Sequence, residues 1–132
     1  MKQATITLVR LYDVGACKKQ CDKFQALFGE SVTFRSKRKF IAACIEHAST
    51  FDFSWAAGVF LNTAACVEYA RVTRSAFAAY HHATVQRSTL PERIAASLSA
   101  ALDGARVAAF LAYERVRAIA FAEAYWNQEN PT

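Results

Sequence analysis

The segments YARVTRSAFA at residues 69–78 and YERVRAIAFA at residues 113–122 repeat one pattern at a distance of 44 positions, or four steps of 11. The same step relates Ala65 to Ala76 and Tyr69 to Tyr80. Eleven residues over three turns is about 3.67 residues per turn, close to the period of a straight α-helix. Each repeat therefore returns its tyrosine to nearly the same face. The pattern predicts two long helices with equivalent faces, paired as a hairpin over residues 64–127.

The boundary between these two helices is predicted from the segment TLPE at residues 89–92. Thr89 and Glu92 fit a capping box, in which Thr89 is the N-cap and Glu92 is the third helical residue. Pro91 then falls in the first turn, where its missing N–H is harmless. We expect one helix near residues 64–86 and a second that restarts at Leu90. Gly104 is expected to kink or split the second helix near Asp103.

The N-terminal half carries shorter helical patterns. Thr7 is the expected N-cap of a helix that ends near Gly15, although residues 5–9, which include the β-branched Ile6, Thr7 and Val9, also fit a strand paired with residues 31–34. We prefer the helix. The following stripe recurs at helical spacing and ends at Gly29; it consists of Cys17, Cys21, Phe24 and Phe28.

A further helix is expected to follow Thr33 as its N-cap. Its apolar face is expected to be Phe40, Ile41, Cys44, Ile45 and Ala48. The segment STFDFSWAAGVFL then supplies helix caps within residues 49–54 and the core candidates Trp55, Val59 and Phe60. The fold class is therefore predicted to be all-α, with five or six helices in a single domain of 132 residues.

Positive charge is concentrated in the first 50 residues. This part has nine basic and four acidic residues, a balance of +5, whereas residues 51–132 have seven of each. The candidate binding residues are Lys18, Lys19, Lys23, Arg35, Lys37, Arg38 and Lys39. On adjacent helices they would form one basic surface able to contact phosphates, with Arg35, Arg38 and Lys39 on one helical side. The alternative is a solvated face that maintains solubility.

Residues 105–126 are apolar on nearly every side, so this helix is expected to be buried on more than one side. It is either the central helix of the bundle or part of an interface with a partner. A symmetric homodimer would satisfy the second interpretation. The interface candidates are Tyr69, Tyr80, Phe110, Tyr113, Phe121 and Tyr125.

The sequence shows no pattern typical of a catalytic site, such as a Gly-rich phosphate loop, G-x-S-x-G or H-E-x-x-H. We expect no enzymatic activity and no cofactor. Cys17, Cys21, Cys44 and His47 supply ligand types suited to zinc, but their spacing does not match a zinc knuckle, so core thiols are the preferred interpretation. His81 and His82 are adjacent on a helix and point about 100° apart, so they do not share a ligand easily.

Signals for export or membrane insertion are not evident in the sequence. The longest stretch without charge is residues 53–67, shorter than the roughly 20 residues that a membrane span needs. Cysteines within helical segments are typical of reduced thiols. We expect a cytoplasmic protein that does not bind a membrane.

Several segments together resemble an uncharacterised group of small helical proteins from phages and bacterial mobile elements. That group has an AC-x-x-Q-x-x-x-F segment, an FG-x-x-V-x-V-T turn, an FDW-x-WAA box and 11-residue AEYERVRA arrays. The matching residues here are Ala16, Cys17, Gln20, Phe24, Phe28, Gly29, Val32, Thr33, Phe51, Asp52, Trp55, Ala56 and Ala57. The resemblance covers most of residues 7–125. It departs from the pattern at Phe53, at RSKRK and at residues 87–101.

The resemblance implies a gene carried by a mobile element in a bacterial host cell, and it transfers no catalytic residue. Two functional hypotheses follow. The first is a non-enzymatic inhibitor that binds a host defence protein or ribonucleoprotein complex, in the manner of an anti-CRISPR. The second is an accessory or regulatory protein that binds DNA or RNA directly through the basic residues.

Overall fold

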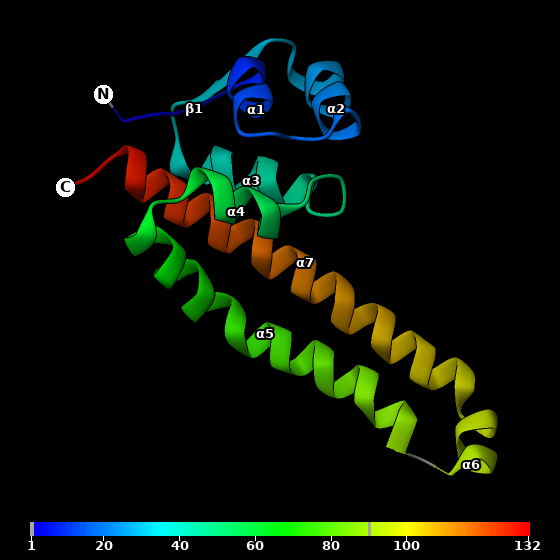
Figure 1. Ribbon diagram of the computed structural model, residues 1–132. Helices are drawn as coiled ribbons and strands as arrows, with labels where there is room; N and C mark the ends of the chain where they lie inside the picture. The colour runs from blue at the N-terminus through cyan, green and yellow to red at the C-terminus, as the bar shows by residue number, and fades with distance from the viewer. Residues whose placement is uncertain (1, 90) are drawn as a thin grey trace.

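The computed structural model describes the backbone of residues 2–89 and 91–132, and the side chains of these residues except 86–89 and 95. Seven helices and one two-stranded sheet are present in this part of the chain (Figure 1). In order they are β1 (Ala4–Thr7), α1 (Leu8–Asp13), α2 (Lys18–Phe28), β2 (Ser31–Phe34), α3 (Lys37–Glu46), α4 (Phe53–Phe60), α5 (Thr63–Thr89), α6 (Glu92–Ser97) and α7 (Ser99–Glu129). The expectation of a mainly helical protein is confirmed, and the all-α prediction fits apart from the small two-stranded sheet and one helix more than the five or six expected.

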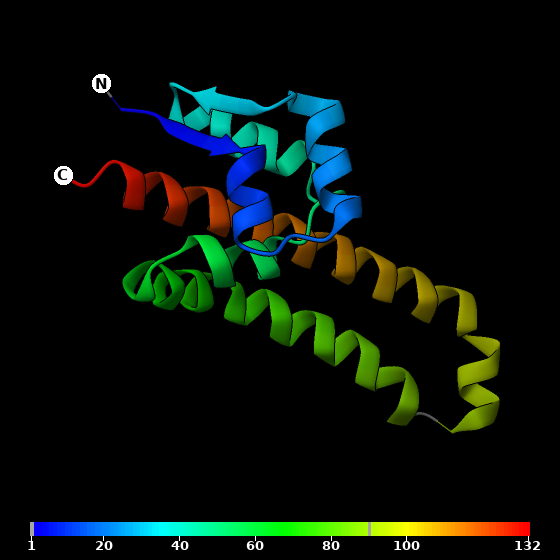
Figure 2. The ribbon, with the colours of Figure 1, turned by 45° about the horizontal axis from the view of Figure 1, so that its top comes forward.

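The molecule has two parts, which Figures 1 and 2 show from two directions. The head contains β1 to α4, the start of α5 and the C-terminal half of α7. The arm, residues 74–89 and 91–113, contains the outer portions of α5 and α7 and the short α6 at its tip. Both chain ends lie at the head, and the arm projects away from them (Figure 2).

The helix expected after Thr7 and the strand that competed with it both form, one after the other. β1 pairs antiparallel with β2, so that Ala4 lies opposite Phe34 and Thr7 opposite Ser31. Thr7 then ends the strand and also caps α1, because its hydroxyl accepts a hydrogen bond from the Arg10 N–H at 3.1 Å. The helix expected after Thr7 therefore exists, but the strand that competed with it directly precedes it.

The N-cap of α3 differs from the expected residue, and the N-cap of α4 lies within the expected segment. Thr33 lies within β2, and the N-cap of α3 is Ser36, whose hydroxyl accepts a hydrogen bond from the Lys39 N–H at 3.4 Å. Ser36 follows the strand directly and has the extended backbone that an N-cap residue adopts. Asp52 caps α4 by accepting from the Trp55 N–H at 3.0 Å, within the segment expected to supply caps.

The C-terminal half of α7 lies at the centre of the head. Tyr125 is 2% exposed, and its ring contacts those of Phe40, Phe60 and Phe121 at centroid distances of 5.6 to 6.2 Å. Its hydroxyl donates to the Thr5 carbonyl at 2.8 Å, which fixes β1 against the helix. Small residues on the same helix, Ala118 and Ala122, are fully buried and allow close packing. One helix thus joins the sheet, α3 and α4 into a common core.

Side chains near the end of α7 also form hydrogen bonds with backbone groups of other segments. The Asn130 amide accepts from the Gln3 N–H at 2.8 Å and donates to the Gln3 carbonyl at 3.0 Å. Gln128 donates to the Phe60 carbonyl at 2.9 Å and accepts from the Asn62 N–H at 2.6 Å. These pairs fix the first strand and the α4–α5 turn relative to α7.

The hairpin of α5 and α7 has different boundaries from those expected. Thr89 is the last residue of α5 and not an N-cap, and the N-cap position of α6 is Pro91. Leu90 lies outside the described residues. The break in the second helical segment falls at Leu98, and α7 runs through Gly104 without interruption. The local signals at Thr89 and Gly104 therefore do not set the ends of these helices.

Truncation of a buried ring in the head is expected to cost more stability than truncation of an exposed ring in the arm. Phe40 is 1% exposed, so Phe40→Ala should reduce the free energy of unfolding by about 3–5 kcal/mol. Phe77, in the arm, is 52% exposed, and Phe77→Ala should cost at most about 1 kcal/mol. Urea titration of both variants measures this difference. Equal losses would contradict a core centred on the head.

Candidate interaction surfaces

The lysines of α2 are largely engaged locally. The Lys18 ammonium lies 3.0 Å from Asp22, and this hydrogen bond raises the pKa of Lys18. Both side chains are exposed, so the pair contributes little to stability. Lys19 is exposed, whereas Lys23 is half-buried and donates to the Thr50 carbonyl at 3.4 Å.

The second basic group, the α3 cluster, consists of Arg35, Lys37, Arg38 and Lys39. All four side chains are exposed, and among the described residues none forms an ion pair with a carboxylate. Lys37 donates to the Asn127 side chain at 3.4 Å. Arg35 precedes the helix and is separated from it by the N-cap Ser36, so the expected helical face of Arg35, Arg38 and Lys39 is not formed.

The two basic groups lie at opposite ends of α3. Lys37 is its first residue, whereas Lys23 contacts Thr50, beyond its last residue. A helix of ten residues is about 15 Å long. In Figure 2, α3 begins beside the chain ends and runs away from them toward α2. The single basic surface expected from the sequence is therefore divided into two.

The six aromatic interface candidates fall into three environments. Phe121 and Tyr125 are each 2% exposed and belong to the core of the head, so they are not available to a partner. Tyr69 is half-buried at the junction of head and arm. Tyr80, Phe110 and Tyr113 lie in the arm, where Tyr80 stacks on Tyr113 with centroids 5.8 Å apart and packs against Phe110 at 5.5 Å.

The stacked tyrosines explain one role of the 11-residue repeat. Tyr80 and Tyr113 occupy the same register of the repeat, one on each helix, and they meet between α5 and α7. Phe77 adds an edge contact to Tyr113 at 5.7 Å and stacks on exposed His81. These rings hold the two helices of the arm together.

Much apolar surface of the arm remains exposed. In Figures 1 and 2 the outer parts of α5 and α7 pack against each other, away from the elements of the head. Six apolar side chains there are 39–52% exposed: Phe77, Ile94, Leu98, Val107, Phe110 and Leu111. We call these six the arm apolar set. Their residue types are normally buried, so their exposure marks the arm as the main candidate surface for contacts with another molecule.

A polar junction lies at the base of the arm and was missed from the sequence. The Arg117 guanidinium donates to the Ser54 hydroxyl at 2.8 Å and lies over the Tyr113 ring at 4.6 Å. Ser54 also lies 3.3 Å from the Tyr69 hydroxyl, and burial raises the pKa of Tyr69. This cluster connects α4, α5 and α7. The sequence does not show that Ser54 approaches the hairpin, so no local spacing of residues predicts this cluster.

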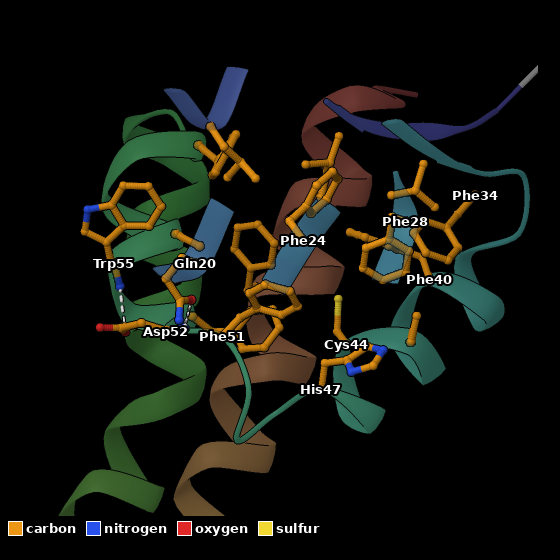
Figure 3. Close-up of a pocket in the computed structure, with 18 residues that line it drawn as sticks. Gln20, Phe24, Phe28, Phe34, Phe40, Cys44, His47, Phe51, Asp52 and Trp55 are labelled. Atoms are coloured by element: carbon orange, nitrogen blue, oxygen red, sulfur yellow. Dashed lines mark hydrogen bonds between the residues drawn. The ribbon is translucent and has the colours of Figure 1, made fainter. Parts of the chain in front are cut away.

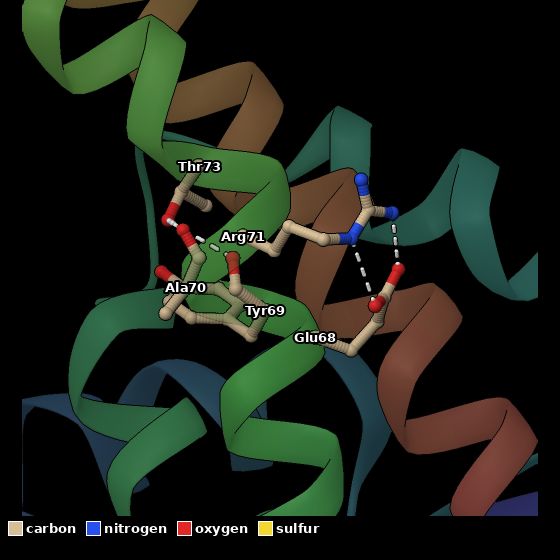
Figure 4. A network of polar contacts seen from close by, with 5 residues as sticks. All are labelled: Glu68, Tyr69, Ala70, Arg71 and Thr73. Atoms are coloured by element: carbon tan, nitrogen blue, oxygen red, sulfur yellow. Dashed lines mark hydrogen bonds and ion pairs between the residues drawn. The ribbon is translucent and has the colours of Figure 1, made fainter.

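The polar contacts around Tyr69 show how the first copy of the repeat is held (Figure 4). The Thr73 hydroxyl donates back to the Tyr69 carbonyl at 3.0 Å, which satisfies this hydroxyl inside the helix. The Arg71 Nε donates to Glu68 at 3.0 Å on the exposed side. The Arg71 pair is therefore a surface feature, whereas Tyr69 faces the head.

The potential zinc ligands do not converge. No group of three or more His, Cys, Asp or Glu side chains suited to a metal gathers within residues 2–89 and 91–132, so far as their side chains are described. Cys17 is exposed, whereas Cys21 and Cys44 are buried. Burial raises the pKa of the Cys44 thiol to about 12, so it remains protonated and unreactive at neutral pH. His81 and His82 are both exposed.

This burial predicts a clear order of thiol reactivity. Under native conditions at pH 8, alkylation should modify Cys17 first, while Cys21 and Cys44 should react only after unfolding, because both thiols are buried and their pKa values are raised. Mass spectrometry of alkylated peptides over time measures this order. Rapid modification of Cys44 in the folded protein would contradict the packing of α3 described above.

No protein-family model, curated protein or solved structure matches this chain. The similarity to phage and mobile-element proteins therefore stays a prediction. Within the described residues, none of the helices combines the length and apolar character needed to cross a bilayer.

Proposed function

We propose that this protein is a non-enzymatic interaction protein that binds another protein through its arm. The observation that carries the proposal is the arm apolar set, a group of large side chains exposed on α5, α6, the junction between α6 and α7, and α7, in the part of the molecule that projects from the head. Apolar residues repeated along a helix are a common basis for docking into a groove or against other helices. Burial of such anchors supplies most of the affinity in many protein interfaces.

The attachment of the arm to the head favours this role. α7 is a single helix from Ser99 to Glu129, and its C-terminal half is packed in the core. The orientation of the arm is therefore set by the head, which reduces the entropy lost when a partner binds. A second copy of this chain is one partner that would cover the arm, as expected for a homodimer.

The most concrete form of the proposal is an inhibitor of a host defence protein or ribonucleoprotein complex, comparable to an anti-CRISPR. This form rests on the resemblance to phage and mobile-element proteins and on small size. The cytoplasm of a bacterial host cell would be its place of action. The arm would occupy a surface that the defence complex needs for its own partners.

Direct binding of DNA or RNA is the second candidate function. It is supported by the α3 cluster, four exposed cations that have no carboxylate partner among the described side chains. Four cations at and just before the start of α3 would give weak binding that depends steeply on salt. The division of the predicted basic surface leaves fewer phosphate contacts than expected, so the arm is the preferred site.

An affinity pull-down from a nuclease-treated bacterial lysate containing defence systems tests the proposal. The wild-type protein should retain a stoichiometric protein partner. Val107→Glu with Leu111→Glu should abolish retention, because both side chains are at least 50% exposed on α7 and a carboxylate there cannot be buried without a large desolvation cost. Bound proteins are identified and quantified by mass spectrometry.

The control is Val9→Glu, which changes an apolar residue on the head that is 67% exposed, more than either arm residue. It should leave retention unchanged. Loss of the partner in Lys37→Glu with Arg38→Glu, but not in the arm variant, would contradict the proposal and favour the nucleic-acid alternative. Binding of naked DNA or RNA at physiological salt by the wild-type protein would support that alternative directly.

A further inference from the structure

One face of α7 in the arm carries a row of exposed residues that change from small to large along the helix. They recur at i, i+4, i+7 and i+11 and therefore share one side of the helix. The side chains of Val107 and Leu111 are 50% and 52% exposed. We call this row the α7 stripe; it consists of four exposed residues, Ala100, Gly104, Val107 and Leu111.

The α7 stripe faces away from α5. The ring of Tyr113 stacks on Tyr80 and so points toward α5. Tyr113 follows Leu111 by two positions, which is about 200° around the helix, so the stripe lies on the opposite side. Among the described elements, α5 and the short α6 at the tip run beside this part of α7 (Figures 1 and 2). The stripe is therefore open to another molecule.

The order of sizes makes the α7 stripe complementary to a second copy of itself. When two such helices run antiparallel about a two-fold axis between Gly104 and Val107, Gly104 lies opposite Val107 of the second copy, and Ala100 lies opposite its Leu111. Each large side chain then meets a small residue, so the two helices pack closely without a gap. A parallel pairing would place Leu111 against Leu111, and this pair would hold the small residues apart.

The charges of this segment also favour a second copy. Between Ser99 and Leu111 the chain has one acidic residue, Asp103, and one basic residue, Arg106, so the net charge is zero. Two copies of the segment therefore meet without net repulsion. A strongly acidic or basic partner, such as a nucleic acid, gains no net attraction from it.

The exposed apolar area of the arm is large enough for a dimer. The six side chains of the arm apolar set are 39–52% exposed, and together they offer on the order of 500 Å² of apolar surface. Val107 and Leu111 belong to this set, and Phe110 lies beside them on the same helix. An interface of standard size buries about 800 Å² per partner, of which somewhat more than half is apolar. The two areas therefore agree.

The pocket in the head is a weaker place for a partner chain. Figure 3 shows its lining, which includes the rings of Phe24, Phe28 and Phe51. Its volume is about 90 Å³, whereas a helix with its side chains is about 10–12 Å wide. Gln20 in the wall already donates to the Thr50 carbonyl at 3.3 Å. The pocket is thus too small to receive a segment of another chain, and the arm is the better candidate.

We propose that the partner of the arm is a second copy of this chain, which packs on the α7 stripe in an antiparallel dimer with two-fold symmetry. The two heads then lie at opposite ends of the assembly and are joined through their arms. This inference deepens the function proposed above, because it rests on the arm as a protein-binding surface and names the partner.

Sedimentation velocity of the full chain tests this assembly. Between about 1 and 300 µM the wild-type protein should shift from monomer to dimer. Gly104→Glu should raise the dissociation constant of the dimer at least about tenfold, because the new carboxylate lies opposite Val107 of the second copy and loses its hydration there.

The same substitution should leave the monomer folded. A Cβ at Gly104 would meet no atom of another described segment within 4 Å, and Glu favours a helix more than Gly does. At a concentration where the wild type is monomeric, Gly104→Glu should therefore have an unchanged or raised thermal midpoint. The control is Ala105→Glu, at an exposed position of the same helix that points about 100° away from Gly104. It should dimerise as the wild type does.

Disulfide trapping tests the antiparallel register, with the exposed Cys17 replaced by Ser. Ala100→Cys mixed with Leu111→Cys should cross-link under mild oxidation, because the two positions face each other across the axis. Ala100→Cys alone should not cross-link. In the antiparallel dimer its two copies lie about 16 Å apart along the helices, whereas a disulfide needs Cα atoms within about 7 Å. The control mixture, in which Ala112→Cys replaces Leu111→Cys, should give little cross-link.

The results distinguish this inference from the function on which it rests. A monomer at every concentration up to about 300 µM, a dimer that Gly104→Glu leaves intact, or cross-linking of Ala100→Cys with itself would overturn the antiparallel dimer. If the wild type is monomeric and Val107→Glu with Leu111→Glu still removes a protein partner from the lysate, the arm binds a different protein. The proposed function then stands and the second copy is excluded as its partner.

Discussion

Burial of α7 on nearly all sides between Ala118 and Trp126, where only Glu123 is exposed, is the constraint on which the rest of the structure depends. Three alanines of this segment, at positions 118, 120 and 122, are at most 3% exposed, and its aromatic residues contact α3 and α4. Alanine lets the neighbouring elements approach closely, and the rings fill the space between them. Each of the short elements around it has too few buried residues to form a core alone, so their common contact with α7 makes them one head.

The same helix continues beyond the core, and this gives the molecule its second part. Between Ser99 and Tyr113, α7 packs against α5, and the exposed apolar residues accumulate there. The arm is therefore an extension of the core helix that was left uncovered. This arrangement combines a firmly anchored base with an exposed apolar surface, which is the physical basis of the proposal that the arm binds another protein.

Sequence reasoning predicted the long helices well, because an 11-residue period is a strong signal over many turns. It also placed Cys21 and Phe24 in the core and the end of α2 at Gly29, since these depend on neighbouring residues alone. The sheet was harder to predict, because each strand has four residues and its partner lies more than twenty positions away. Ser36, and not Thr33, caps α3 because Thr33 is part of strand β2. The division of the basic surface and the Arg117 junction arise only when distant segments meet, so no local pattern predicts them.

The most direct test of this account is native-state hydrogen exchange, resolved along α7. We predict that the backbone amides of residues 118–126 are the most protected in the protein and open only on global unfolding. The amides of residues 99–112, in the same helix, should exchange faster by about two orders of magnitude or more, because only one neighbouring helix covers them. Uniform protection along α7 would contradict the division into a buried base and an uncovered arm.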